Sequence, residues 1–140
     1  MNGVDTNVLV YFVDRQEPAK RAKALSLIDW LVNEESDETV LLWQVLAEFL
    51  SCLRRWENDG RIDRLETIAN LERVELLFRC ALPTQAVLNL SLDLSFRHSL
   101  SHWDSMLLAA CIDAGVDTLY SEDLGHGVKY DSVTVINPFV

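Results

Sequence analysis

Short apolar segments alternate along this chain with longer segments whose apolar residues recur at helical spacing. The clearest strand candidate covers residues 39–43, where β-branched and apolar side chains occupy both faces, as is typical of a buried parallel strand. Four more strands are predicted, over residues 1–4, 78–82, 117–121 and 132–136. This alternation favours an α/β fold, in which a parallel sheet is covered by helices on both faces.

Helices are predicted between the strands, over residues 18–31, 44–56, 61–77, 83–96 and 101–114. Proline suits the start of a helix, and Pro18 and Pro83 each stand at one. Gly115 follows the last helix, at the position where a left-handed residue commonly ends a helix. Residues 33–38 are predicted to form an acidic, solvated connector. The length suits one domain over residues 1–140.

Four acidic residues stand where strands pass into loops or helices. Asp5 follows the first predicted strand, and Asp123 follows the fourth. Glu48 lies one turn into the helix after the second strand, and Asp104 lies in the first turn of the last helix. Ligands of parallel α/β sheets bind outside the carboxyl ends of the strands, so we expect the four carboxylates to gather there. Glu122 is expected to face solvent, because side chains alternate along a strand.

Each of these acids also has a purely structural interpretation. Asp5 suits a turn or a helix cap, and Asp123 suits an ordinary loop. Glu48 could occupy the exposed face of an amphipathic helix. Ser101 and Asp104 have the spacing of a capping box, in which a carboxylate also favours the helix dipole. Apolar sequence surrounds the acids, however, and an unpartnered carboxylate is costly there. The combination of the four is therefore more specific than any one of them.

A ligand set made only of oxygen atoms predicts Mg²⁺ or Mn²⁺ rather than zinc. Two carboxylates about 4 Å apart repel by roughly 4 kcal/mol at an effective dielectric of about 20, so a cation would stabilise the cluster. Asp5 and Asp104 are the expected direct ligands, while Glu48 and Asp123 are expected to hold coordinated waters or a second ion. The chemistry expected of such a site is attack by an activated water on a phosphodiester.

The formal net charge of −10 argues against nonspecific binding to nucleic acid, because like charges repel at long range. Two observations weaken that objection. A carboxylate cluster that holds a metal ion is partly neutralised, and basic residues at 20–23 and 54–64 could form local patches. The acidic total also fits a chain that works with a basic partner.

Cysteine and histidine usage excludes several other classes of site. Cys52, Cys80 and Cys111 are widely separated within apolar sequence, so we expect buried free thiols rather than disulfides or a zinc site. The three histidines lack the spacing of a histidine metal site. No apolar run reaches the roughly 20 residues that cross a bilayer, and no signal peptide is evident. A cytoplasmic protein with no membrane partner is expected.

Four segments contain the acids in a recognisable setting: VDTNVLVY at 4–11, QVLAEF at 44–49, HWDSMLLAAC at 102–111 and LYSEDLGHG at 119–127. They resemble the motifs of PIN-domain ribonucleases, and more narrowly those of VapC-type toxins from bacterial toxin–antitoxin modules. The ending VINPF at 135–139 resembles that family as well. The resemblance spans almost the whole chain, and residues 58–100 are its least diagnostic part.

The resemblance implies a PIN-like three-layer α/β/α sandwich with a central, mostly parallel sheet of four or five strands. It implies that the four acids form the metal site of an endoribonuclease that leaves 5′-phosphate and 3′-hydroxyl ends. Asn7 would orient the first acid, and Ser121 would supply a small hydroxyl to the site. The implied partners are an RNA substrate, a cognate antitoxin that inserts a basic residue into the acidic cleft, and a second copy of the chain in a homodimer.

Two positions depart from the family pattern. Only residues 1–4 precede the first acid, so the first strand is short, and Gly3 weakens it further. Trp43 stands where a small hydroxyl residue is expected, and its ring would narrow access to the site. Neither departure removes a carboxylate.

Three other functions compete with the ribonuclease. A non-catalytic acidic α/β domain that binds a protein partner fits the net charge well. A receiver-type phosphoacceptor domain needs an aspartate at the end of the third strand, and residues 78–83 contain no acid. A DNA-directed nuclease of the same fold is the closest competitor.

Overall fold

Six strands form one sheet within residues 1–33 and 37–140, which are the residues that the computed structural model describes. In sheet order they are β3 (Arg79–Ala81), β2 (Thr39–Leu42), β1 (Asn2–Val4), β4 (Thr118–Tyr120), β6 (Val133–Ile136) and β5 (Lys129–Tyr130). All neighbouring strands are parallel except β5 and β6, which are antiparallel. The predicted mostly parallel sheet is confirmed, with one strand more than the four or five expected.

The strand that the sequence did not predict is β5. It has two residues, which are too few for an alternating pattern to show. It exists because the chain turns back on β6, where Lys129 pairs with Thr134 and Tyr130 pairs with Val133. Such a pairing depends on the neighbouring strand, so local sequence carries little sign of it.

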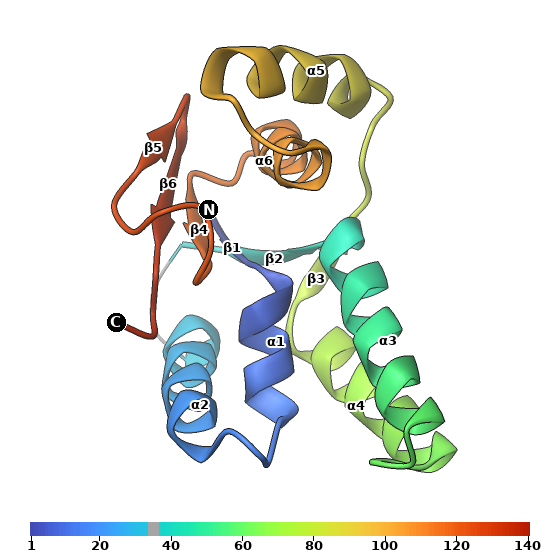
Figure 1. The fold of residues 1–140 in the computed structure, drawn as a ribbon. Helices are drawn as coiled ribbons and strands as arrows, with labels where there is room; N and C mark the ends of the chain where they lie inside the picture. The colour runs from blue at the N-terminus through green and yellow to red at the C-terminus, as the bar shows by residue number, and fades with distance from the viewer. Residues whose placement is uncertain (34–36) are drawn as a thin grey trace.

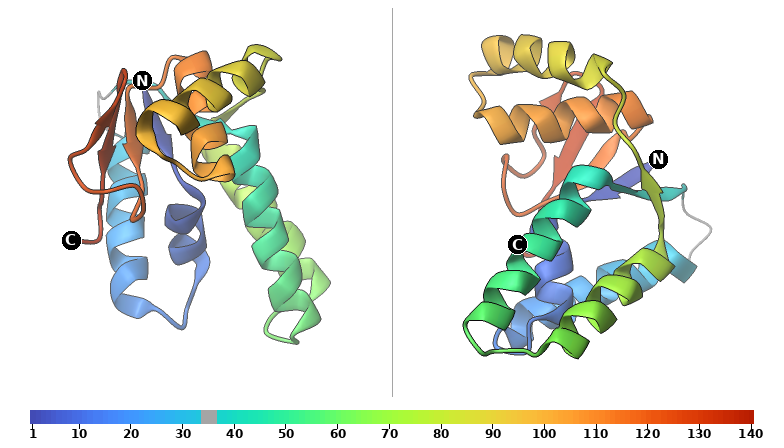
Figure 2. Two further views of the ribbon diagram at one scale, coloured as in Figure 1. Left: turned by 45° about the horizontal axis from the view of Figure 1, so that its top comes forward. Right: turned by 90° about the vertical axis from the view of Figure 1, so that its right-hand side faces the viewer.

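Helices cover both faces of the sheet (Figure 1). In the described part of the chain they are α1 (Thr6–Val13), α2 (Pro18–Asn33), α3 (Trp43–Asn58), α4 (Arg64–Leu77), α5 (Ala86–His98) and α6 (His102–Ala114). α5 and α6 lie above the sheet, and α1 and α2 lie below it. α3 and α4 lie side by side as a hairpin that extends away from the sheet (Figure 2). The predicted three-layer α/β/α arrangement is therefore confirmed.

The predicted helices are all present, but some starts differ. The helix expected from Pro83 begins at Ala86, and the preceding Thr84 instead hydrogen-bonds to Asp113 of α6. The helix expected from residue 61 begins at Arg64, because the Asp63 side chain accepts a 2.8 Å hydrogen bond from the backbone N–H of Glu66 and caps the helix there. The strand expected over 39–43 ends at Leu42, because Trp43 already belongs to α3. Gly115 ends α6 at φ +83°, as predicted.

α1 is the one helix that the sequence did not predict. Its residues include three β-branched valines, which favour strands over helices. Asp5 adopts an extended conformation at the N-cap and its side chain accepts a hydrogen bond from the backbone N–H of Thr6. Val8, Leu9 and Phe12 are buried, so packing on the sheet stabilises this short helix.

The short first strand lies at the centre of the sheet. β1 pairs with β2 on one side and β4 on the other, and all three of its residues are buried. A β-carbon at Gly3 would lie 3.2 Å from Cγ1 of Val116, so this position favours glycine through close packing. The glycine that weakens the strand in sequence terms allows the close approach of its neighbour.

Two further expectations concern the burial of the cysteines and the absence of a membrane-spanning helix. Cys52 and Cys111 are buried free thiols as predicted, whereas Cys80 is only half-buried. None of the described helices combines the length and apolar character needed to cross a membrane. The predicted acidic connector is only partly testable, because its central residues, 34–36, lie outside the described part of the chain.

Candidate functional site

The carboxyl ends of β1 and β4 lie side by side, at the point where strand order reverses. From β1, the chain moves one way to β2 and the other way to β4. Val4 pairs with Tyr120 in parallel register, so the residues that follow them, Asp5 and Ser121, are neighbours. Parallel α/β folds commonly bind ligands at such a place.

Asp5 is held by two hydrogen bonds. Its Oδ1 accepts a 2.6 Å bond from the backbone N–H of Thr6, and its Oδ2 accepts a 2.7 Å bond from the hydroxyl of Ser121. Its own backbone N–H donates to the carbonyl of Tyr120 at 2.9 Å. These bonds fix the carboxylate at the top of the core, and Asp5 acts as a helix cap at the same time.

Burial makes the charge of Asp5 costly. The residue is only 7% exposed, and loss of solvent is the main cause that raises its pKa to about 6. Hydrogen bonds from Ser121 and Thr6 lower the pKa, while the negative charges of Glu48 and Asp123 raise it further. Glu48 and Asp123 are therefore close enough to Asp5 to act on its charge, whereas Asp104 is not among the groups that shift this pKa.

Asn7 and Ser121 tie the loop after β4 to α1. The Asn7 amide nitrogen donates to Asp123 Oδ2 at 3.3 Å, and the Asn7 amide oxygen accepts from the backbone N–H of Glu122 at 3.3 Å. The Ser121 hydroxyl oxygen accepts from the backbone N–H of Asp123 at 3.0 Å. Ser121 thus contacts Asp5. Asn7 was expected to orient Asp5, but its side chain contacts Asp123 and Ser121 instead.

Glu48 joins the site through side chains that the sequence did not single out. Its Oε2 accepts a 2.9 Å bond from the Thr6 hydroxyl, and its Oε1 accepts a 2.9 Å bond from the Gln44 amide. The same Gln44 nitrogen donates to the carbonyl of Trp103 at 3.2 Å, which links α3 to the start of α6. Two spacings could have indicated these partners: Thr6 follows Asp5 directly, and Gln44 precedes Glu48 by one helical turn.

Asp104 lies next to Trp103 in the first turn of α6. Ser101 is the N-cap, and its hydroxyl accepts from the backbone N–H of Asp104 at 3.3 Å. In the described part of the chain, the Asp104 carboxylate makes no hydrogen bond or ion pair. The capping interaction is therefore made by the Asp104 backbone, and its side chain is left available to a ligand.

A cation is the counter-charge that this arrangement lacks. None of the four acids forms a salt bridge with a lysine, arginine or histidine in residues 1–33 and 37–140. By contrast, Asp14, Glu57 and Asp131 each pair with an arginine. A buried carboxylate without a cationic partner, surrounded by further carboxylate and hydroxyl oxygens, fits a hard divalent cation in the chemistry of the donor set.

The side chains do not form a closed set of ligands. Across the described residues, no three His, Cys, Asp or Glu side chains lie close enough together to hold a metal ion. Mg²⁺ usually keeps several waters and binds through one or two carboxylates, so a site of this kind does not require three protein ligands. Direct ligation by Asp5 and Asp104 stays a prediction.

Glu122 departs from its expected place. Its carboxylate is half-buried and accepts a 2.7 Å bond from the Tyr11 hydroxyl and a 3.0 Å ion pair from Lys20. Alternation along β4 does not apply, because the strand ends at Tyr120. The expectation that Glu122 faces solvent was therefore wrong. The ion pair ties α2 to the loop that holds Asp123.

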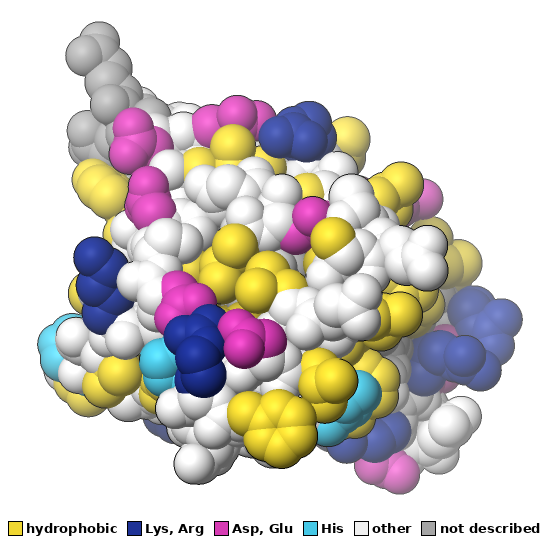
Figure 3. Space-filling view, turned by 90° about the horizontal axis from the view of Figure 1, so that it is seen from above, with side chains coloured by type: hydrophobic (Ala, Val, Ile, Leu, Met, Phe, Trp, Pro, Cys, Tyr) yellow, Lys and Arg dark blue, Asp and Glu magenta, His cyan; other side chains and the backbone are white. Residues whose placement is uncertain are grey.

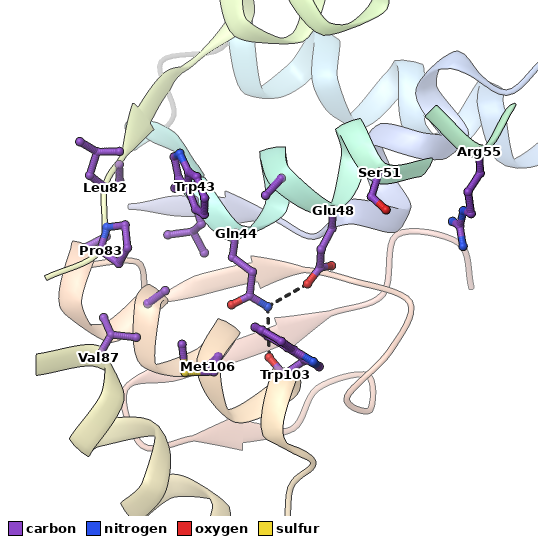
Figure 4. Close-up of a pocket in the computed structure, with 15 residues that line it drawn as sticks. Trp43, Gln44, Glu48, Ser51, Arg55, Leu82, Pro83, Val87, Trp103 and Met106 are labelled. Carbon is purple, nitrogen blue, oxygen red and sulfur yellow. Dashed lines mark hydrogen bonds between the residues drawn. The ribbon is translucent and has the colours of Figure 1, made fainter. Parts of the chain in front are cut away.

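A pocket of about 810 Å³ opens beside Glu48, between the start of α3 and α6 (Figure 4). Its lining is mostly apolar and includes Trp43, Leu82, Val87, Trp103 and Met106. The Trp43 side chain is 53% exposed and lines the pocket, as the expectation of a ring near the site mouth suggested. The acidic site therefore has an apolar wall on its α3–α6 side.

Comparisons with known proteins place this geometry in a family. The PIN domain family model matches residues 4–127. VapC20 of Mycobacterium tuberculosis, a toxin that cleaves the sarcin–ricin loop, has a similar structure with 17% identity and a TM-score of 0.60, over 88% of this chain and 90% of that one. A toxin–antitoxin complex from Klebsiella pneumoniae contains a chain with 16% identity and a TM-score of 0.65, over 99% of this chain and 98% of that one.

A search of curated protein sequences finds no significant match. The family model covers most of the chain, including Asp5, Glu48, Asp104 and Asp123. The chain therefore belongs to the PIN domain family, as the sequence motifs indicated, and the similarity of the solved structures confirms its fold.

Proposed function

We propose that this PIN domain is a divalent-metal-dependent endoribonuclease whose acidic residues are Asp5, Glu48, Asp104 and Asp123. The observation that carries the proposal is the absence of any cationic partner for these four side chains in the described part of the chain. Asp5 is buried among them with a pKa raised to about 6. A purely structural role would give such a carboxylate a cationic partner, as Arg61 is for the buried Asp14.

The chain's own residues have separate tasks in this proposal. Asp5 and Asp104 would hold Mg²⁺ or Mn²⁺ directly, and Glu48 and Asp123 would orient its hydration shell. Ser121 and Thr6 keep the Asp5 carboxylate oriented, and both bonds favour its ionised form. When bound, the ion supplies Lewis-acid chemistry to the phosphodiester and to the attacking water.

RNA is the proposed substrate, with 5′-phosphate and 3′-hydroxyl product ends. One structural neighbour is described as a toxin that cleaves the sarcin–ricin loop, and the motifs of this chain resemble those of VapC-type toxins. A DNA-directed nuclease of the same fold makes the same metal demands. Substrate choice must therefore be measured.

The test is a cleavage assay with end-labelled RNA and DNA in Mg²⁺, in Mn²⁺ and in excess chelator. We expect RNA cleavage that requires metal and is lost in Asp5→Asn and in Asp104→Asn. Asp29→Asn is the matched control, because it makes the same change on an exposed face of α2. Cleavage that survives in chelator and in Asp5→Asn would end the proposal, and cleavage of DNA alone would move it to the competing nuclease.

The same proposal extends to a toxin of a type II toxin–antitoxin pair. A cognate antitoxin would place a basic side chain among the unpaired acids, which suits a chain with a formal net charge of −10. A small neighbouring gene for a DNA-binding protein would support this pairing. Co-expression with that protein should suppress RNA cleavage, and full activity in the resulting complex would contradict it.

A homodimer is the second proposed assembly. The face above the sheet carries hydrophobic side chains among its charged ones (Figure 3). Along α5, Leu88, Leu92 and Phe96 are 58%, 59% and 79% exposed, and helical spacing places them in one stripe. A protein interface would bury such a stripe. Light scattering should give twice the mass of one chain, and a monomer at micromolar concentration would contradict it.

A further inference from the structure

Four arginines converge on a second pocket, of about 360 Å³, beyond the C-terminal end of α1. We call this the arginine pocket and define it by Arg15, Arg21, Arg61 and Arg73. These are four of the chain's 12 lysines and arginines, and the one carboxylate in the lining is Glu66. In a chain of net charge −10, this is a strong local concentration of positive charge.

The arginines come from four separate segments. Arg15 lies between α1 and α2, Arg21 lies on α2, Arg61 lies between α3 and α4, and Arg73 lies on α4. No single stretch of sequence therefore predicts the cluster. The fold assembles it where the ends of these helices meet.

Two of the four guanidinium groups are held in place by neighbours. Arg61 donates a 2.8 Å ion pair to the buried Asp14 and lies 4.0 Å from the centre of the Trp56 ring. Arg73 lies 4.4 Å from the centre of the Phe12 ring. Stacking on an aromatic face orients a planar guanidinium and leaves its N–H groups available at the edges.

Arg15, Arg21 and Arg73 have guanidinium N–H groups that no carboxylate binds in the described part of the chain. The Nε of Arg21 is buried and makes no hydrogen bond in the same residues. An unpaired, buried guanidinium donor is costly, and the other N–H groups of this guanidinium could bind an anion in the pocket.

A second hollow lies beside Glu48, along α1 and α3. This hollow, of about 440 Å³, is lined by Asn7 and Val10 of α1 and by Glu48, Cys52 and Arg55 of α3, among others. The arginine pocket is lined by residues one turn further along the same two helices. On α1 the step is from Val10 to Val13, and on α3 it is from Cys52 to Trp56.

The length of α1 sets the distance between the two sites. Eight residues at about 1.5 Å each make the helix roughly 12 Å long. Arg55 lies between them, exposed and without a salt bridge within the described residues. A single nucleic-acid strand can cover such a distance with a few nucleotides, so that phosphates meet cations at both Arg55 and the arginine pocket.

We propose that the arginine pocket binds a backbone phosphate of the RNA strand whose scissile bond lies at Asp5, with the strand passing through the hollow along α1 and α3. This rests on the proposed ribonuclease function and names how an acidic protein holds its polyanionic substrate. Guanidinium groups bind phosphate through paired N–H donors, which suits a pocket built from arginine without lysine.

The test measures binding separately from cleavage. Anisotropy of a 5′-labelled single-stranded oligoribonucleotide is followed in chelator, where the strand is not cut. Arg15→Gln combined with Arg73→Gln is compared with Arg79→Gln, because Arg79 is an exposed arginine that pairs with Glu38 elsewhere on the surface. Arg61 is left intact, since its loss would leave the buried Asp14 without its partner.

We expect the double variant to bind the oligonucleotide more weakly and to flatten the dependence of log affinity on log salt by roughly 0.7, the change for the loss of one phosphate contact on a single strand. A dinucleotide, which is too short to reach the arginine pocket from Asp5, should bind wild type and double variant alike. Arg79→Gln should leave both affinities unchanged. Thermal melting of each variant confirms that the fold is retained.

Several results would overturn the proposal. Equal oligonucleotide affinity in the wild type and the double variant would remove the pocket from the RNA path. If Arg79→Gln loses as much oligonucleotide affinity as the double variant, the loss reflects the total charge of the protein and not the arginine pocket. If inorganic phosphate or a mononucleotide raises the Tm of wild type but not of the double variant, while RNA affinity is unchanged, the ligand is a free phosphate. If the double variant loses affinity for polyglutamate but keeps its affinity for RNA, the ligand is an acidic protein segment.

The two proposals fail in different ways. If wild type never cleaves RNA but the double variant still loses binding, the nuclease is wrong and the phosphate site stands. If cleavage is normal and the double variant binds and cleaves like wild type, the phosphate site is wrong and the nuclease stands.

Discussion

The Ser121 hydroxyl donates a 2.7 Å hydrogen bond to Oδ2 of Asp5, across the junction of two neighbouring parallel strands. The serine is fully buried, and the aspartate is 7% exposed. The bond favours the ionised form of a carboxylate that burial disfavours. The hydrogen bond therefore offsets only part of the cost of burying the Asp5 charge. A bound cation would offset more of that cost.

Asp5→Asn should stabilise the metal-free protein. The folded-state pKa of about 6 lies above the ordinary value of 3.8, so the folded protein holds this proton more tightly than the unfolded chain does. Stability is consequently lost as pH rises from about 4 to about 6, by an amount on the order of 3 kcal/mol. Asparagine removes the charge, so we expect a free energy of unfolding about 1 to 3 kcal/mol higher at pH 7 in chelator.

Asp14→Asn is the matched control for this measurement. Asp14 is 8% exposed, similar to Asp5, but it is paired with Arg61 at 2.8 Å. Its neutralisation should lower the free energy of unfolding instead. Urea denaturation in chelator separates the two signs, and a destabilised Asp5→Asn would show that the Asp5 carboxylate is already satisfied within the protein.

Mg²⁺ should raise the Tm more at pH 7.5 than at pH 5. The ion binds the ionised form of Asp5, and below a pKa of about 6 a proton competes with it. Stabilisation by a ligand follows its effective affinity, so weaker binding at low pH gives a smaller shift. Melting curves at both pH values, at constant ionic strength set with KCl, make the comparison, and Asp5→Asn should abolish the difference. Equal shifts at the two pH values would place the ion elsewhere.

Ser121→Ala should move the acid limb of the cleavage pH profile to higher pH. The Ser121 hydrogen bond lowers the pKa of Asp5, so its loss raises that pKa further. We expect activity near neutral pH to fall by about 10- to 100-fold, as when a group that orients a metal ligand is removed. The variant should also lose about 1 to 3 kcal/mol of stability.

Ser91→Ala controls for the loss of a buried serine outside the site. The Ser91 hydroxyl donates to the carbonyl of Leu88 within α5 at 2.7 Å, and its side chain is 7% exposed. This variant should lose stability without a shift in the pH profile. A profile unchanged in Ser121→Ala would show that the serine is structural only.

Ser101→Ala and Asp104→Asn should separate helix capping from catalysis. The Ser101 hydroxyl caps α6, so its removal should cost about 1 kcal/mol of stability and leave cleavage close to wild type. Asp104→Asn keeps that cap, because the capping bond uses the Asp104 backbone N–H. We expect it to lose most cleavage with little change in Tm. Full activity in Asp104→Asn would remove Asp104 from the metal site.

Only some of the side chains that contact the acids could be predicted from the sequence. Ser121 and Asn7 were predicted because they belong to motifs that also contain Asp5 and Asp123. Thr6 and Gln44 were not predicted, although each contacts Glu48. Their roles depend on the distance between α1 and α3, which no local pattern specifies.

The arginine pocket was only partly visible in the sequence. Basic residues at 20–23 and 54–64 were noted as possible patches, and Arg21 and Arg61 come from them. Arg15 and Arg73 lie outside both groups. A pattern that joins four segments appears only when the helices pack together.

Local sequence determined the elements of this protein and the position of its acids along them, because side-chain periodicity, helix caps and turn residues act over a few neighbouring positions. Tertiary structure alone decided that β1 is central, that Asp5 lies against Ser121, and that Asp5 carries an unpaired charge in a buried place. The reason is physical: register and desolvation arise from contacts between residues far apart in the chain. Each of these contacts exists only when the whole sheet has formed.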